Sequence, residues 1–254
     1  MLVSRRLGEG EKLSCRLGLS MKTEQAVNWG SSWLLPAALS MTAGAVDVIG
    51  FLALGGLFTA HITGNLVVLL AHYITGNFGE IGPLLAVPIF IVVLGVVTLT
   101  FIRKPTSIAR RELLVLQVVL LACFLGFGAG FGAFPNPDSG MAVFVGMLGV
   151  AAMATQNAVV RFALPGAPST AVMTTNIVQV TVDLARLLRG QLEDNERRTV
   201  RHRADATLFA VIGFLIGLAV GAVLEMHFGF RSLIFPSILA AASIPLGERW
   251  PSHP

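Results

Sequence analysis

Polar side chains that could bind a solute occur inside apolar sequence at two places. The first combines Asp47, in "TAGAVDVIGF" (42–51), with the stretch "TAHITGN" (59–65), and the second combines "QN" (156–157) with "TAVMTTN" (170–176). A carboxylate can coordinate a cation or carry a proton, and an imidazole binds a proton near neutral pH. Hydroxyl and amide groups can replace the water around a small solute. The sequence predicts a substrate-binding group made of Asp47, His61, Thr63, Asn65, Gln156, Asn157, Thr174 and Asn176.

Each of these residues also has a structural interpretation. A carboxylate at membrane depth can be held by hydrogen bonds to backbone, a histidine can be a packing residue, and asparagine can join helices. No HExxH, GxSxG or phosphate-binding glycine loop occurs in the chain. We therefore expect no catalytic residues, no metal and no cofactor, and we rank a membrane-embedded enzyme using Asp47 and His61 below the non-enzymatic hypotheses.

The composition places these residues in a membrane protein. Hydrophobic residues make up 54% of the 254 residues and charged residues only 13%, against about 25% charged in soluble domains. The mean hydropathy is +0.77. The net charge of +4 comes from short basic clusters between apolar runs, which is typical of a topology signal and not of a nucleic-acid surface. The lipid bilayer is therefore the predicted partner, and nucleic acid is not.

Eight apolar segments follow a polar N-terminal stretch. Residues 1–30 carry no apolar core followed by a cleavage site, so we expect a cytoplasmic tail and no cleaved signal peptide. The predicted segments are 33–54, 58–75, 83–102, 112–134, 140–162, 170–188, 206–226 and 232–247. The predicted domains are the tail 1–30, a first membrane repeat 31–134, a second membrane repeat 135–247 and a C-terminal tail 248–254.

The basic clusters conflict with eight full crossings. Lys and Arg near segment ends collect on the cytoplasmic side, and they cluster here in the N-terminal tail, at 103–111 and at 189–203. Three crossings would separate each cluster from the next and so place neighbours on opposite faces. The conflict disappears if 58–75 and 170–188 are re-entrant or broken helices, which leaves six crossings. Eight crossings with a weak charge bias remain the alternative.

Two stretches indicate an internal repeat. "TAHITGNLV" (59–67) and "TAVMTTNIV" (170–178) are identical at five of nine positions, all separated by 111 residues, and three of these identities are Thr or Asn. The predicted fold is therefore an all-α integral membrane protein with six to eight transmembrane segments in two four-segment repeats. Six crossings would insert the two halves in opposite orientations, which is a recurring arrangement in transporters. Chance similarity between apolar stretches is the alternative.

The stretch "AGAVDVIGFLALGGLFTAHITGN" (43–65) resembles the YoaK-type family of bacterial membrane proteins, a domain of unknown function. "QNAVVR" (156–161) and the Thr-rich stretch after it are also similar to that family. The resemblance covers about 33–247 and implies a multi-pass inner-membrane protein without an assigned activity. The chain has Thr174-Thr175 where such relatives usually have a second Thr-Gly pair, so exact symmetry of the two half-sites is not expected.

The leading functional hypothesis is a transporter or channel-like permease for an unknown small solute or ion. Its path would run between the repeats of a multi-pass protein in the bacterial inner membrane, with a cytoplasmic N-terminus. The alternative is a non-catalytic membrane scaffold or assembly partner. Glycines at every fourth position allow a helix to approach closely and offer a route to an oligomer. These glycines are Gly213, Gly217 and Gly221.

The charge pattern predicts that 103–111 and 189–203 lie on the same, cytoplasmic, side. Single cysteines at Ser107 and Asn195, in a chain lacking Cys15 and Cys123, should both be protected from an impermeant thiol reagent added outside intact cells. Both should react after the membrane is opened, which serves as the control. Labelling of one position but not the other from outside would favour eight crossings.

Overall fold

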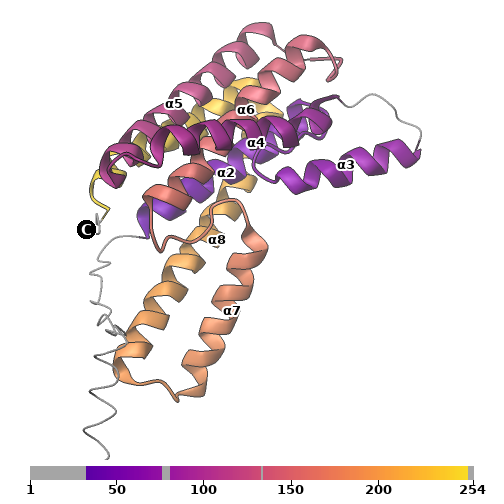
Figure 1. The fold of residues 1–254 in the computed structure, drawn as a ribbon. Coiled ribbons are helices and arrows are strands. Elements are labelled where there is room, and N and C mark those ends of the chain that lie inside the picture. Colours follow the sequence, from indigo (N-terminus) through magenta and orange to yellow (C-terminus); the bar gives the residue numbers. More distant parts are fainter. Residues whose placement is uncertain (1–32, 76–80, 133, 251–254) are drawn as a thin grey trace, which may run out of the picture. The chain divides into compact units, whose positions relative to one another are not determined.

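A computed structural model describes residues 33–75, 81–132 and 134–250, which belong to one compact unit (Figure 1). These residues form helices and irregular connections, and no strand occurs among them. The predicted all-α class is therefore confirmed. The predicted N-terminal tail, 1–30, lies outside the described residues.

The chain order follows the eight predicted segments, each of which overlaps one α-helix. A π-helical turn, η1, continues the fifth of these helices, and a 3-10 turn, η2, joins the last two. The elements are α2 (Leu34–Ala53), α3 (Ile62–Thr75), α4 (Ile81–Phe101), α5 (Thr106–Phe131), α6 (Gly140–Ala158), η1 (Val159–Ala163), α7 (Met173–Arg189), α8 (Asp194–Phe228), η2 (Gly229–Leu233) and α9 (Ile234–Glu248).

Five helical stretches among the described residues are long and apolar enough to cross a membrane. They correspond to α2, α4, α5, α6 with η1, and the continuous run from α8 through η2 to α9. The two helices that are not in this set are α3, an apolar helix of 14 residues, and α7, which has 17 residues. These are the segments that the basic clusters single out as non-crossing. The protein is thus a membrane protein with several apolar helices.

The start of α8 differs from the prediction. The polar run 189–205 was expected to separate two segments, but the helix already begins at Asp194. Glu and Arg are good helix formers, and Asp183 of α7 holds the run in place by accepting from Arg203 through both carboxylate oxygens, at 2.5 and 2.8 Å. The Arg203 guanidinium holds the pKa of the Asp183 carboxyl below its usual range. As a result, α7 lies beside the first part of α8 (Figure 1).

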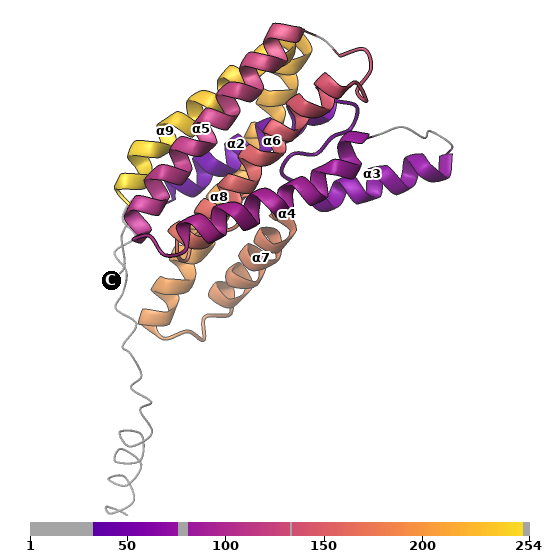
Figure 2. The ribbon, with the colours of Figure 1, turned by 45° about the horizontal axis from the view of Figure 1, so that its top comes forward.

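The long helices pack in pairs that are distant in the sequence. The most extensive packing is between α2 and α8, and α6 packs against both α4 and α5. In addition, α9 packs against α2 and α5, and Figure 2 shows α5 and α9 side by side. The short helices contact their successors, α3 with α4 and α7 with α8. The core comprises small and branched residues of α2 and α6 together with rings from α5, α8 and η2.

Glycines allow α2 and α8 to approach at backbone distance. A Cβ on Gly217 would lie 2.1 Å from the carbonyl oxygen of Met41, and one on Gly213 would lie 2.6 Å from that of Ala37. Gly44 makes the reciprocal approach from α2, where a Cβ would lie 2.3 Å from the carbonyl oxygen of Phe214. This face of α8 therefore packs against α2 of the same chain.

Gly217→Ala should destabilise the protein because the added methyl group meets backbone, which cannot rotate away. We expect a loss of roughly 1–3 kcal/mol, seen as a lower midpoint of thermal unfolding in detergent. The matched control is Gly95→Ala in α4, where a Cβ would meet nothing within 4 Å. Equal midpoints for the two variants would contradict the close α2–α8 packing.

Candidate functional site

The first candidate site is built around a break between α2 and α3. Gly55 and Gly56 have φ values of 63° and 89°, a region that favours glycine because it lacks a Cβ. They end α2, and the loop 54–61 then brings residues 59–61 back to Asp47, which lies within the helix. The glycine pair therefore allows non-helical backbone to return into the helix bundle.

The Asp47 carboxylate is the anchor of this loop. Its Oδ1 atom accepts from the backbone amides of Thr59 and Ala60 at 2.8 Å each, and from the amide of His61 and the hydroxyl of Thr59 at 3.4 Å. Asp47 is 2% exposed, so it does not face lipid, as an acidic side chain at this depth requires. These hydrogen bonds provide the buried carboxylate with donors. They also provide an acceptor for the loop amides, which lie outside a helix and so lack a helical carbonyl partner.

His61 completes the contacts of Asp47. Its Nδ1 atom lies 2.6 Å from the other carboxylate oxygen, Oδ2, and 34% of its side chain is exposed. Its ring packs edge-on against Phe214 of α8, with the centroids 5.4 Å apart. The pair formed by Asp47 and His61 thus joins a fully buried acid to a partly accessible base. That combination can hold or exchange a proton.

The two asparagines each donate a hydrogen bond to a loop carbonyl seven residues earlier, in corresponding positions of the two halves. The side-chain amide of Asn65 donates to the carbonyl of Phe58 at 2.7 Å, and its oxygen accepts from the Phe58 amide at 2.8 Å. The side-chain amide of Asn176 donates to the carbonyl of Ser169 at 2.5 Å. In each case the partner lies seven residues earlier, in the loop before the short helix. Both asparagines therefore fix a loop to the start of its own helix.

In the second half a buried glutamine, Gln156, contacts the loop before the short helix. The Gln156 side-chain amide donates to the Thr170 hydroxyl at 3.0 Å and to the Leu39 carbonyl at 2.9 Å, so it ties the loop 164–172 to α2. The Gln117 side-chain amide of α5 donates to the Gln156 oxygen at 2.7 Å. All of these polar groups are buried, and the Gln117 oxygen has no hydrogen-bond partner among the described residues.

The remaining predicted site residues lie away from these clusters. Thr63 and Thr174 are exposed, each one residue after the start of its helix. The Asn157 side chain donates to the carbonyl of Met153 in its own helix at 2.8 Å. The structure brings Asp47 and His61 together, with Asn65 holding the same loop, and places Gln156 at the second loop. The hydrogen bonds of Asn65 and Asn176 stay within their own halves, and no described hydrogen bond joins the two asparagines.

Two threonines and one glutamine of these networks were not among the predicted site residues. Thr59 and Thr170 carry a signal, since they occupy matching positions in the two similar stretches and are separated by the same 111 positions as the asparagines. Their hydroxyls meet Asp47 and Gln156, respectively. Gln117 has a weaker signal, as a polar residue in the apolar run 113–125.

The apolar helices and buried polar loops define a multi-pass α-helical membrane protein. The family model "Protein of unknown function (DUF1275)" matches residues 35–245. The chain therefore belongs to the DUF1275 family, in agreement with the YoaK-type resemblance. It is 60% identical over 35 residues to the UPF0700 transmembrane protein YoaK of Bacillus subtilis (strain 168), a match that spans 14% of this chain and 16% of that protein. No solved structure matches the chain.

Asp47→Ala should destabilise the protein more than Asp47→Asn. Alanine leaves the loop amides buried without an acceptor, at a cost of roughly 3 kcal/mol or more, whereas asparagine keeps one acceptor oxygen and should cost about 1–2 kcal/mol. Thermal unfolding in detergent measures the difference. Asp205→Asn, at an exposed position of α8, is the control for the removal of an acid. If alanine and asparagine at position 47 give equal stability, the carboxylate does not anchor the loop.

Proposed function

We propose that the protein is a permease for a small solute or ion in the bacterial inner membrane, with its path between two inverted halves. The halves are α2–α5 and α6–α9, and the N-terminus is cytoplasmic. The observation that carries the proposal is a helix break in each half, at which an extended loop is held inside the bundle by a buried polar side chain. Irregular backbone at membrane depth is typical of transporter and channel sites, where it lines a polar path.

The helix packing supports a duplication. If α2, α3, α4 and α5 are matched to α6, α7, α8 and α9, the pair α2–α8 corresponds to α6–α4, and α2–α9 corresponds to α6–α5. The pair α3–α4 corresponds to α7–α8. The short helices begin at Ile62 and Met173, which are again separated by 111 positions. The asparagine hydrogen bonds, to Phe58 and Ser169, keep the same separation.

The helix lengths support opposite orientations of the halves. At 1.5 Å per residue, α3 and α7 are roughly 21 and 26 Å long, shorter than a bilayer core of about 30 Å. Because α9 has only 15 residues, it reaches the length of a crossing only together with η2, over 229–248. Counting α8 as one crossing and η2 with α9 as another gives six crossings, three in each half. An odd number of crossings turns the second half over. It also brings the basic clusters at 103–111 and 189–203 to the same side of the membrane, as the charge rule requires.

In this permease, Asp47 and His61 would be the pair that binds and releases a proton. The buried carboxylate anchors the loop, and the imidazole is the partner that solvent can reach. The ring of Phe214, from the second half, borders the imidazole, so the pair lies where the halves meet. Because the second loop contacts Gln156 and not an acid, only the first loop can change its charge.

A membrane scaffold without transport is the second candidate. It is favoured by the observation that Asp47 and Asn65 bind loop backbone directly. Hydrogen bonds of this kind would account for the polar residues without any solute. The two candidates therefore differ in whether the anchored loop also conducts.

Purified protein in liposomes should produce a flux that depends on Asp47 and His61. Proton flux would be followed with an internal pH dye, and permeation of urea, glycerol, sodium and potassium by stopped-flow light scattering under osmotic shock. We expect flux of at least one probe, reduced at least tenfold in Asp47→Asn and His61→Gln. The flux of Asp205→Asn, the matched control, should equal that of the unmodified protein.

Correct insertion of each variant would be established by its thermal unfolding and by its elution as a single species. Folded protein with no flux above that of empty liposomes, for every probe, would favour the scaffold. Flux that is unchanged in both variants would remove the pair from the path.

A further inference from the structure

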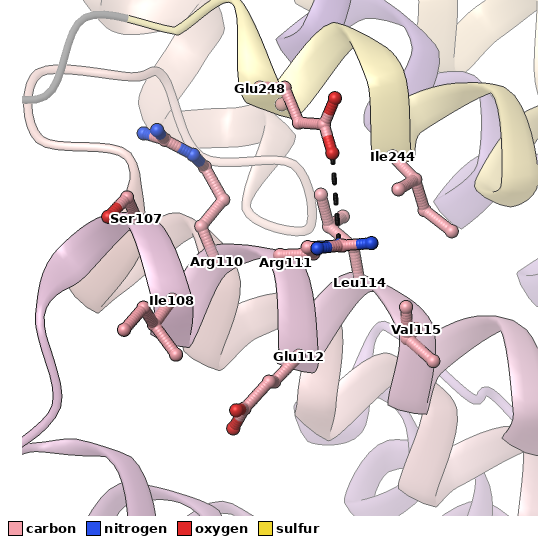
Figure 3. Close-up of a pocket in the computed structure, with 10 residues that line it drawn as sticks. Ser107, Ile108, Arg110, Arg111, Glu112, Leu114, Val115, Ile244 and Glu248 are labelled. Atoms are coloured by element: carbon pink, nitrogen blue, oxygen red, sulfur yellow. Dashed lines mark ion pairs between the residues drawn. The ribbon is translucent and has the colours of Figure 1, made fainter.

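A cavity of about 570 Å³ lies between the first turns of α5 and the last turns of α9, away from Asp47 and His61. Figure 3 shows its lining residues, which combine charged groups near the helix ends with apolar groups further along α5 and on α9. The charged end of the cavity belongs to the basic cluster 103–111. A helix end of this kind in a membrane protein lies at the level of lipid headgroups.

Arg110 carries a buried positive charge at this cavity. The residue is 3% exposed, and its guanidinium donates to the carbonyls of Ala163 at 3.3 Å and Trp250 at 3.2 Å. No carboxylate among the described residues lies within ion-pair distance of it. Carbonyl oxygens orient a guanidinium but do not neutralise it, and a buried charge without a counter-ion is costly. The arrangement favours an anion in the cavity.

Arg111 and Ser107 provide further donors on the same part of α5. Arg111 is largely exposed and only loosely paired, with its Nε atom 3.8 Å from Glu248 (Figure 3). Ser107 lies in the first turn of α5, whose N-terminus has no side-chain cap. Free amides and the helix dipole at such an end attract negative charge. Glu112 extends away from α9 in Figure 3 and pairs with Lys104.

The rest of the cavity suits hydrocarbon. Leu114 and Val115 of α5 and Ile244 of α9 line it beyond the charged end. The crevice is narrow at Gly247, where α9 lies against the Leu114 side chain of α5. A Cβ at this position would lie only 2.7 Å from that side chain. A ligand for the whole cavity therefore needs an anionic head and an apolar continuation.

We propose that this cavity binds the phosphate of an anionic phospholipid. Arg111 and Ser107 contact the phosphate, the buried charge of Arg110 attracts it, and the apolar walls of α5 and α9 receive the glycerol backbone and the start of the acyl chains. Basic pockets between transmembrane helices bind anionic headgroups in the same manner. A free phosphate shares the chemistry of the head but lacks the apolar part, so the two ligands can be distinguished.

Binding would be measured by titration calorimetry on the full chain in an uncharged detergent. The probes are dihexanoyl phosphatidylglycerol, dihexanoylglycerol, which lacks the phosphate, and inorganic phosphate. We expect saturable binding of phosphatidylglycerol, at least tenfold tighter than that of either other probe. Arg111→Gln should weaken it about tenfold, because a charge-assisted contact is lost. The control is Arg189→Gln, at the exposed end of α7, which should bind like the unmodified protein.

Arg110→Gln should also weaken phosphatidylglycerol binding, because it removes the buried positive charge, but this buried position can also affect folding. Ile244→Trp therefore provides a second variant, which fills the apolar part of the cavity without a change of charge. It should weaken phosphatidylglycerol at least tenfold and leave inorganic phosphate unchanged.

Equal affinity for phosphatidylglycerol and inorganic phosphate would overturn the lipid assignment. Phosphatidylglycerol binding that is the same in Arg111→Gln, Ile244→Trp and the unmodified protein would overturn the site itself. Neither result depends on whether the protein transports a solute.

Discussion

The structure depends on one constraint, which is that a chain leaving its helix inside the bundle must still satisfy every backbone amide. In this protein the Asp47 carboxylate meets that requirement for residues 59–61, and Asn65 meets it for Phe58. A carboxylate is suited to the task because one oxygen can accept several hydrogen bonds at once. The hydrogen bonds between them reduce both the cost of burying the acid and the cost of burying the loop amides. Neither the loop nor the acid would be stable at this depth alone.

The close packing of α2 and α8 determines what surrounds this loop. Gly44 lies three residues before Asp47, and the backbone carbonyl of Phe214 packs against it. The ring of the same phenylalanine contacts His61. The glycines of α8 and the polar loop are therefore parts of one arrangement. A larger residue at the helix crossing would move Phe214 relative to the imidazole. Packing at the α2–α8 crossing thus places the Phe214 ring beside His61.

Helix positions and the place of Asp47 within the first apolar helix could be predicted from the sequence, because apolar runs and glycine pairs report local conformational preferences. The charge pattern also identified α3 and α7 as the two segments outside the set of long apolar helices. The partners of the polar residues could not be predicted, because a hydrogen bond between Gln156 and Leu39 spans 117 positions and depends on tertiary packing. Asn65 and Asn176 illustrate the difference. Their identity in both repeats was visible, but the reason for it is the loop seven residues earlier.

The difference between the two loops is the feature that separates architecture from function. Each loop carries, near its end, a threonine held from the long helix before it, and leads into a short helix fixed by an asparagine. The architecture therefore requires only a buried acceptor or donor at the anchoring position. Gln156 meets this requirement without a charge. Asp47 anchors its loop with a negative charge and has a histidine partner, both of which the second loop lacks. A charge is expensive to keep inside a membrane protein. The two loops thus share an anchoring arrangement and differ in charge.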